Sequence, residues 1–559
     1  MPSWTVAIHA AAGWLLLATA CAPARSSPVP APSALVRAES LYADLRALRD
    51  RIEVTTAAAR PATADGAPLD TLVRRYHALR RTLIPELATL SPSPPPDDGR
   101  ALRVMRAALD GELGAIAPAS GGASTTAVRG APDCDYDARA IAALSKGLDS
   151  LTRRAYACYG WAQHHVMVGG ERMDRLSVLS TIARTEDRDE RRRLFLALDP
   201  VWRSVNADGG ASSPYRQIVA LTAHRPGERP AAVSARALGI EPDTLERWLV
   251  AMLEAWRRGT PDTLIEPWDW HYLGGAASRR LSTRIPPARL AGLNAEVFRA
   301  LGADPESLEV RYDLTPREGK TPVAFTTFGA RARRMNGAWT PAEPWVFATY
   351  RTGGLDNLNE LLHETGHAVH IAAIRTRPAF TDWPDSDPFT EGLADVVALD
   401  AYEPAWQQRW LGDSATTADA LRGRYAGIVL DVAWALFEIR MQREPEADPN
   451  QVWSAITHEY LRIRPHPDLS WWAMRGQLIN LPGYMLNYAA GAVLIAAIRE
   501  RIRELHGPFT AGDLSWYGWV APRLYRFGLE RSSRDVIEAF LGGPVTPDAI
   551  LRDMGRLGG

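Results

Sequence analysis

Two histidines and a glutamate in the middle of the chain have the spacing of a metal-binding helix. The pattern His-Glu-x-x-His occurs in His363-Glu364-Thr365-Gly366-His367. Histidines four residues apart on a helix project from one face, one turn apart, so both imidazoles can bind one Zn²⁺ ion. The intervening glutamate is rotated around the helix and can activate a water molecule at the metal. The motif predicts metal-assisted hydrolysis, with His363 and His367 as ligands and Glu364 as general base.

A third ligand is expected from the next predicted helix. Glu391 lies 24 residues after His367, at the start of an apolar, helix-forming segment over residues 388–395. Catalytic zinc sites use three protein ligands and leave one position for water. Asp395, one turn after Glu391, can accept the remaining N–H of a ligating imidazole. We therefore expect one Zn²⁺ per chain, held by His363, His367 and Glu391.

The segment around the motif is suited to a rigid platform. Leu358, Leu361 and Leu362 give the predicted helix an apolar face that can be buried. Gly366 stands in the middle of the helix, where a glycine costs about 1 kcal/mol relative to alanine. A close approach by another backbone would explain this glycine.

These motifs resemble those of the gluzincin peptidases of the angiotensin-converting-enzyme and oligopeptidase F/thimet type. Residues 389–399 are very similar to the third-ligand helix of the former. Segments similar to the latter are Gly319-Lys320 with Ala324-Phe325, residues 345–350 with Leu355-Asp356, and residues 267–270. The resemblance is strong over about residues 265–500.

The resemblance implies a mainly α fold. It implies a two-lobed helical clamshell with a deep central cleft, a zinc ion at the floor of the cleft and a small β-sheet beside the zinc helix. It also implies that Ala324 and Phe325 contribute to substrate binding. The implied reaction is hydrolysis of peptide bonds in short peptides by water that zinc and Glu364 activate.

The resemblance assigns a second catalytic role to a tyrosine. Tyr488 matches a residue that donates a hydrogen bond to the developing oxyanion, and Tyr484 lies on the same helical face and is assigned to substrate binding. Two core tyrosines packed four residues apart are the alternative. The group usually carries a histidine shortly before this segment, where the present chain has Gln477 and Asn480.

The mode of cleavage stays open at this point. A peptidyl-dipeptidase, which releases C-terminal dipeptides, needs a cation that holds the substrate's terminal carboxylate. Arg475, which lies 13 residues before Tyr488, is the candidate, with a surface arginine as the alternative. A general oligopeptidase is the favoured interpretation. The sequence also allows a broad endopeptidase, an inactive zinc-binding envelope lipoprotein or a zinc-free structural lipoprotein.

The apolar spacing predicts helices through most of the chain. Residues 35–132 are expected to form an N-terminal helical lid region, and residues 133–559 the catalytic domain. Strands are expected only within residues 308–350, where 308–312 and 345–350 are predicted as short strands. The predicted helices are 35–60, 69–90, 100–116, 138–168, 186–206, 243–258, 288–301, 355–375, 389–400, 417–443, 450–463, 482–504 and 533–541.

The beginning of the chain indicates export. Residues 1–20 are read as a signal peptide, and Cys21 follows small residues, as at a bacterial lipoprotein cleavage site. Residues 21–34 would then tether the protein to the periplasmic side of the cell envelope through a lipid on Cys21. An ordinary signal peptide with a chance cysteine is the alternative. In an oxidising compartment Cys134 and Cys158 form a natural disulfide, with two buried free thiols as the alternative.

Composition excludes some partners. Lys and Arg number 64 against 65 Asp and Glu, which gives a net charge of -1. No global field therefore recruits nucleic acid. We expect peptides as substrates, membrane association only through the lipid on Cys21, and a monomer.

Overall fold

The computed structural model describes residues 33–58, 69–90, 95–111, 132–134, 136–144, 147–223, 229–261, 263–317, 320, 323–335 and 337–558. The predicted signal peptide, Cys21, most of the tether and Gly319 lie outside the described residues. Within the described ranges, no helix combines the length and the apolar character needed to cross a bilayer.

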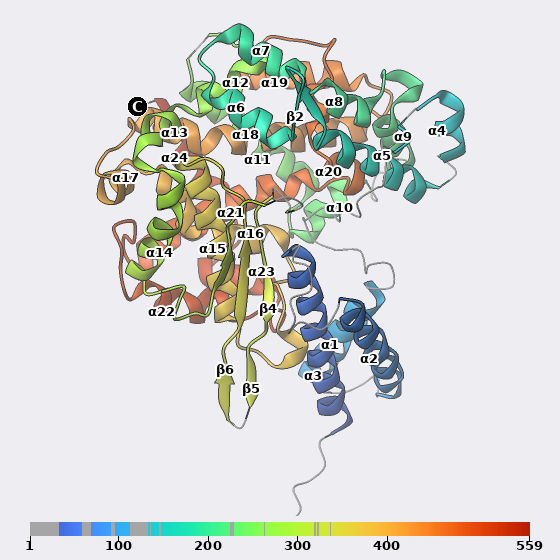
Figure 1. Ribbon diagram of the computed structural model, residues 1–559, viewed down its shortest axis with the longest axis vertical. Helices are drawn as coiled ribbons and strands as arrows, with labels where there is room; N and C mark the ends of the chain where they lie inside the picture. The colour runs from blue at the N-terminus through green and yellow to red at the C-terminus, as the bar shows by residue number, and fades with distance from the viewer. Residues whose placement is uncertain are drawn as a thin grey trace, which may run out of the picture.

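The chain folds into a mainly helical body (Figure 1). It has two large hydrophobic cores, and each core belongs to one lobe. The helices of the first lobe are α4 (Ala138–Leu144), α5 (Leu148–Gln163), α6 (Arg175–Arg184), α7 (Arg188–Leu196), α8 (Asp199–Asn206), α9 (Pro214–Thr222), α10 (Pro230–Ala237), α11 (Pro242–Gly259), α12 (Trp270–Gly274), α18 (Thr417–Arg443), α19 (Pro449–Leu461), α20 (Gln477–Asn480) and α24 (Asp548–Met554). The mainly α, two-lobed prediction is confirmed.

The second lobe carries the predicted zinc helices. Its helices are α13 (Ala276–Leu281), α14 (Leu290–Ala300), α15 (Leu355–Ala373), α16 (Asp387–Ala398), α17 (Pro404–Leu411), α22 (Trp516–Val520) and α23 (Ser533–Leu541). Helix α21 (Met485–Leu505) joins the lobes, because its first half packs into the first core and its second half into the second. The expected helices at 417–443 and 533–541 have the bounds of α18 and α23.

A separate unit precedes the two lobes. It consists of α1 (Ala34–Ala57), α2 (Leu69–Thr89) and α3 (Pro96–Gly111), which lie together at one end of the molecule (Figure 1). The unit has its own apolar core, and Ala379 and Phe380 of the second lobe complete that core. Its described contacts include β4 (Phe325–Ala330) and the short helix η7 (Pro378–Phe380). That these helices roof the cleft stays a prediction.

A small sheet lies beside the zinc helix, as expected. Strand β7 (Glu343–Phe347) is central, with β3 (Arg311–Asp313) parallel on one side and β4 antiparallel on the other. Both β4 and β7 contact α15. Because β7 is its only neighbour in the sheet as described, β4 is an edge strand. Two further strands, β5 (Arg333–Met335) and β6 (Ala338–Thr340), form a hairpin that protrudes from the body (Figure 1).

The expectation that strands occur only within 308–350 was wrong. Strands β1 (Val166–Val168) and β2 (Glu171–Met173) form an antiparallel hairpin, so the helix expected over 138–168 ends with α5 at Gln163. The connecting Gly169 and Gly170 have φ of 59° and 90°. Positive φ at both positions suits the tight turn whose twist matches paired strands.

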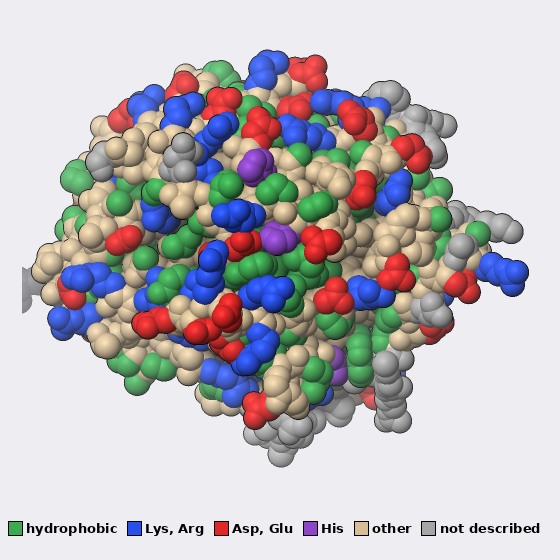
Figure 2. Space-filling view, turned by 90° about the horizontal axis from the view of Figure 1, so that it is seen from above, with side chains coloured by type: hydrophobic (Ala, Val, Ile, Leu, Met, Phe, Trp, Pro, Cys, Tyr) green, Lys and Arg blue, Asp and Glu red, His purple; other side chains and the backbone are tan. Residues whose placement is uncertain are grey.

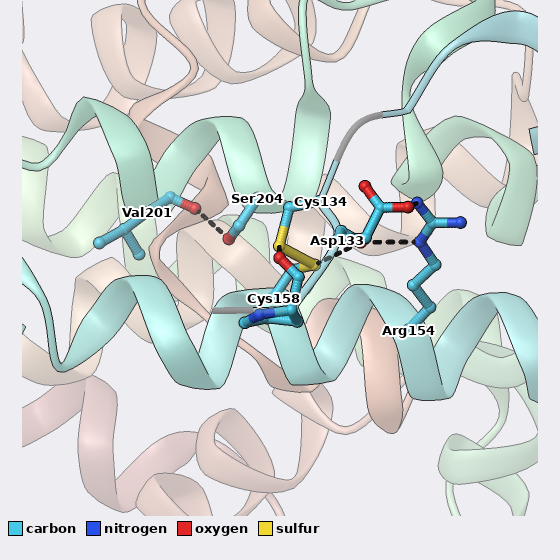
Figure 3. The surroundings of a disulfide bond; sticks show 7 residues. Asp133, Cys134, Arg154, Cys158, Val201 and Ser204 are labelled. Atoms are coloured by element: carbon cyan, nitrogen blue, oxygen red, sulfur yellow. Dashed lines mark hydrogen bonds and ion pairs between the residues drawn. A yellow bond between two sulfur atoms is a disulfide. The ribbon is translucent and has the colours of Figure 1, made fainter. Parts of the chain in front are cut away.

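The predicted disulfide between Cys134 and Cys158 is present (Figure 3). Cys158 lies in α5, and Cys134 lies in the segment that leads to α4. In the same place Arg154 of α5 forms an ion pair with Asp133 at 2.9 Å (Figure 3). The segment before α4 is therefore joined to the first lobe by a covalent bond and by a charge pair.

The surface carries both signs of charge. On the face shown in Figure 2, acidic and basic side chains are interspersed, with apolar side chains between them. This distribution agrees with the net charge of -1. On this face, no large field of one sign is available to attract a polyanion.

Candidate metal centre

The two ligand helices approach each other more closely than side chains normally allow. A Cβ atom at Gly366 of α15 would lie 2.3 Å from the carbonyl oxygen of Ala394 in α16 and 2.8 Å from its Cα. Only a glycine fits at this distance. The close backbone approach expected at Gly366 is therefore found, and it fixes α15 and α16 against each other at the level of the predicted ligands.

The predicted ligands meet at one point. Within the described ranges, His363, His367 and Glu391 form a group whose ligand atoms all lie within 4.8 Å of one another. Glu391 Oε2 lies 3.3 Å from His363 Nε2 and 3.6 Å from His367 Nε2. Ligands bound about 2.0–2.2 Å from a tetrahedral zinc ion are about 3.4 Å apart. The spacing of these donor atoms therefore fits a zinc ion.

Electrostatics at the site favour a bound cation. Burial raises the pKa of Glu391, but the nearby imidazoles of His367 and His363 outweigh it and hold that pKa well below its usual range. Burial lowers the pKa of His363, whereas the carboxylates of Asp395 and Glu391 raise it well above its usual range. The carboxylates of Asp395 and Glu391 thus stabilise positive charge at the position of His363.

Asp395 lies where the sequence places it. Its Oδ1 is 2.8 Å from His363 Nδ1, so the Nδ1–H of the imidazole donates to the carboxylate. This bond fixes the tautomer that leaves Nε2 free to bind metal, and it raises the basicity of the ligand.

Glu364 follows the predicted ligand His363 on α15. Its side chain is only 6% exposed. Thr326 of β4 lies with its Oγ1 2.7 Å from Glu364 Oε2 and 2.8 Å from the Glu364 carbonyl oxygen. The hydroxyl of Thr326 therefore fixes the orientation of the Glu364 carboxylate. The sequence motif gives no sign of Thr326, because no strand is predicted at that position.

The tyrosine pair lies near the ligand Glu391, at the start of α21. The rings of Tyr484 and Tyr488 are 5.5 Å apart in an edge-to-face arrangement. Burial raises the pKa of both hydroxyls, and the charge of Glu391 contributes to both shifts. Both hydroxyls thus stay protonated and can donate. Gln477 Nε2 donates to Tyr488 Oη at 3.1 Å, so this glutamine holds the hydroxyl in the segment where the resembling group has a histidine.

Replacing Tyr488 by Phe is expected to lower kcat by about 10²–10³ with little change in KM, the range for loss of one oxyanion donor. Steady-state hydrolysis of a fluorogenic peptide measures both constants. Tyr484→Phe, which removes the neighbouring hydroxyl, is the matched control and should have the smaller effect. The assignment is refuted by an unchanged kcat in Tyr488→Phe.

Arg475 lies beside Tyr488 but already has a partner. It forms an ion pair with Asp431, and its guanidinium lies 4.6 Å from the Trp434 ring centroid and 5.8 Å from that of Tyr488. The carboxylate of Asp431 neutralises much of its charge. Arg475 is therefore placed near the site with little free charge for a substrate carboxylate.

The predicted substrate segment leads into the edge strand. Phe325 begins β4, stacks on Phe347 with ring centroids 5.0 Å apart, and is followed directly by Thr326. Ala324 precedes it, and both side chains are half-buried. An edge strand can pair with an extended peptide through its free backbone groups. Its position beside Glu364 suits the role assigned to Ala324 and Phe325.

Two carboxylates on the zinc helices are open to solvent. The side chain of Glu391 is 47% exposed. Glu360 of α15 is also exposed, and burial together with the neighbouring Glu364 raises its pKa to about 7. A substrate can therefore reach the predicted metal position from the side of Glu391.

The tyrosine helix is held at its start by a buried acid. Glu438 of α18 accepts hydrogen bonds from the backbone N–H groups of Gly483 at 2.7 Å and Met485 at 3.1 Å. Burial raises the pKa of Glu438 from 4.5 to about 8. Between these values the folded protein keeps a proton that the unfolded chain loses, so stability falls as pH rises.

Replacing Glu438 by Gln removes this titration. We expect the melting temperature of Glu438→Gln, relative to the native protein, to increase from pH 5 to pH 8. At pH 5 the variant should be the less stable protein, because its amide N–H faces one of the backbone N–H donors. Thermal unfolding at both pH values measures the difference. A difference that does not depend on pH contradicts the assignment.

Solved structures of other proteins share the helical architecture of this chain. The sequence matches no protein-family model and no curated protein. The structure resembles the M32 carboxypeptidase from Deinococcus radiodurans R1, with 14% identity, a TM-score of 0.53, and 94% of this chain and 98% of that chain covered. It resembles Trypanosoma cruzi metallocarboxypeptidase 1, with 13% identity, a TM-score of 0.51, and 94% and 99% covered. It also resembles PZ peptidase A with an inhibitor, with 15% identity, a TM-score of 0.53, and 94% and 97% covered.

These similarities extend over nearly the whole chain. At such low identity they establish a shared helical fold and do not transfer an activity. The closer relationship to the angiotensin-converting-enzyme and oligopeptidase F group stays a prediction.

Proposed function

We propose that this protein is a zinc-dependent peptidase that hydrolyses peptide bonds in short peptides. The observation that carries the proposal is the meeting of His363, His367 and Glu391 at the spacing of a tetrahedral zinc site, directly beside Glu364. The shared fold with proteins named as an M32 carboxypeptidase, a metallocarboxypeptidase and a peptidase supports it.

A bound zinc ion supplies Lewis acidity and a water molecule of low pKa at this position. Glu364, held by Thr326, takes the proton of the attacking water and can return it to the departing amine. Tyr488 donates its hydroxyl hydrogen to the carbonyl oxygen as negative charge develops there. Asp395 holds the proton on His363 Nδ1 and so keeps Nε2 free.

The oligopeptidase mode is the first candidate, because an edge strand near a solvent-exposed Glu391 can take up an extended peptide without binding its end. A carboxypeptidase mode is the second candidate. It is favoured by the shared fold with two proteins named as carboxypeptidases. The peptidyl-dipeptidase mode depends on Arg475, whose pairing with Asp431 weakens it.

A series of quenched peptides of increasing length, each with a free or an amidated C-terminus, distinguishes these modes. Products are identified by mass spectrometry, and Glu364→Gln is the inactive control. Cleavage at internal bonds that persists in amidated peptides supports the oligopeptidase. Release of single residues or of dipeptides, abolished by amidation, supports the carboxypeptidase or the peptidyl-dipeptidase. Rapid digestion of casein supports a broad endopeptidase. Zinc binding with no hydrolysis of any peptide supports the inactive lipoprotein.

We further propose that the protein acts as a monomer outside the cytoplasm, tethered to the cell envelope through a lipid on Cys21. Mass spectrometry of the mature protein should find a diacylglyceryl group on an N-terminal Cys21. A soluble form that retains Met1 contradicts this location.

A further inference from the structure

The two histidine ligands are held by different means. Asp395 fixes the ring of His363 through a hydrogen bond to Nδ1. The Nδ1 atom of His367 is buried and has no hydrogen-bond partner among the described residues. A ligating imidazole usually has its orientation fixed by a bond at its other nitrogen. The ring of His367 must therefore be oriented by a packing contact.

Trp383 makes that contact. Its ring meets the ring of His367 edge-to-face, with centroids 5.5 Å apart at an interplanar angle of 70°. It meets His370, one turn further along α15, at 5.6 Å and 63°. His370 is fully buried, and neither of its ring nitrogens has a partner in the described part of the chain, so it packs as a neutral aromatic ring. The indole thus bridges two histidines of the zinc helix.

Trp383 lies in the connection between α15 and α16, and a buried charge network holds this connection. Asp382 accepts a hydrogen bond from the Trp383 backbone N–H at 2.9 Å. Asp382 also pairs with Arg46 of α1 and, at 3.2 Å, with Arg331, which follows β4. Arg331 in turn pairs with Asp50 of α1 through two bonds of 2.7 and 3.0 Å. The side chains of Arg331 and Asp50 are only 7% and 2% exposed.

Apolar contacts reinforce the same connection. Phe380 and Ala379 are buried in the core of the α1–α3 unit, a few residues before Trp383. Phe328 of β4 packs on Trp383 with centroids 5.0 Å apart, and the Arg331 guanidinium lies 4.0 Å from the Phe328 ring centroid. The position of Trp383 is thus determined by α1 on one side and by β4 on the other.

The network is charged at neutral pH. Burial raises the pKa of Asp382, but Arg331 and Arg46 outweigh burial and lower it to about 2. Removing one member of a buried ion pair leaves an uncompensated charge, so the loop must then move or take up water. Such movement would displace Trp383 from His367.

We propose that Trp383 is a positioning residue for the zinc ligand His367, and that the α1–α3 unit sets zinc affinity by holding Trp383 through Asp382. The proposal rests on the proposed zinc site. It gives the N-terminal helices a role in the metal centre that is independent of any covering of the cleft.

Zinc affinity of the purified, metal-free protein tests the proposal, with Zn²⁺ alone as the probe and a chromophoric chelator as competitor. Trp383→Leu and Asp382→Asn should each weaken zinc binding by about 10–100-fold, the range for losing a group that orients a ligand. Trp383→Phe keeps an aromatic edge and should stay within about threefold of the native protein. Visible absorption of the Co²⁺-loaded protein should change in Trp383→Leu and not in Trp383→Phe.

Asp269→Asn is the matched control. It breaks the ion pair between Asp269 and Arg191 in the first lobe, in which the two charged groups are 2.7 Å apart. The side chains of Arg191 and Asp269 are 8% and 9% exposed, so this pair is about as buried as that of Arg331 and Asp50. Its zinc affinity should stay native. If Trp383→Leu does not fold, Asp50→Asn tests the same network from α1, and circular dichroism verifies folding throughout.

Native zinc affinity in folded Trp383→Leu, or an equal loss in Asp269→Asn, overturns the proposal. Either result leaves the peptidase proposal intact. Conversely, the proposed function is refuted if the native protein binds zinc and hydrolyses no peptide. That result does not contradict the role of Trp383 in zinc binding.

Discussion

Glu364→Gln is expected to bind one zinc ion per chain and to hydrolyse peptides at least about 10²–10⁴-fold more slowly than the native protein. The amide keeps the shape of the side chain but cannot accept the proton of the attacking water. Because Glu364 is not a ligand, metal content should not change. Metal analysis and kcat/KM on one peptide measure the two quantities together.

A second variant tests the same role of Glu364 with a smaller expected loss of kcat. Thr326→Val removes the hydroxyl 2.7 Å from Glu364 Oε2 and leaves the carboxylate in place. Hydrogen bonds to charged groups contribute about 1.5–3 kcal/mol, so kcat should fall about 10–100-fold. The assignment of Glu364 as base is wrong if Glu364→Gln is fully active or has lost its zinc.

Glu391→Ala and His363→Ala are expected to lose zinc and activity together. Each removes one of three protein ligands, and two ligands do not hold zinc at micromolar concentrations of metal. The native protein should melt at a higher temperature when zinc is added, because zinc binds only the folded state, and both variants should lack this shift. Metal analysis after gel filtration gives the stoichiometry.

Asp395→Asn provides the control for ligand removal. It keeps all three ligands but weakens the bond that orients His363, so zinc affinity should fall only about 10–100-fold. Stoichiometric zinc in Glu391→Ala would show that another residue completes the site.

Local pattern was enough to predict which residues meet at the candidate metal site and where most helices lie. His363 and His367 are brought together by one helical turn, and a single additional residue, Glu391, completes the set. Gly366 also carried local information, because its cost within a helix predicted a close neighbour, which is Ala394. In both cases the sequence signal lies within one turn of α15, and the partner lies on the next helix, α16.

Contacts between distant segments could not be predicted from local pattern. Arg475 was a candidate for binding a substrate carboxylate, with a surface arginine as the alternative, and its partner Asp431 lies 44 residues away. Thr326 and Trp383 belong to segments whose sequence pattern does not indicate a metal site. Their contacts with Glu364 and His367 form only when these segments pack against α15 in the folded protein. The β1–β2 hairpin is a different case, because a local signal was present. Gly169-Gly170 indicates a turn, but the helical spacing before it led to the prediction of a helix up to residue 168.

The partners of α1 lie far along the chain, which bears on how the protein matures. Asp50 and Arg331 are 281 residues apart, and Arg46 and Asp382 are 336 apart. A chain that emerges N-terminus first therefore presents α1 without its partners Arg331 and Asp382, and with an incomplete apolar core, until Phe380 and Asp382 have followed. The core of the α1–α3 unit and the candidate metal site are completed by neighbouring segments, because Glu391 follows Asp382 closely in the chain. A chain that ends before these segments lacks both, and its exposed apolar helices make it a target for chaperones and proteases.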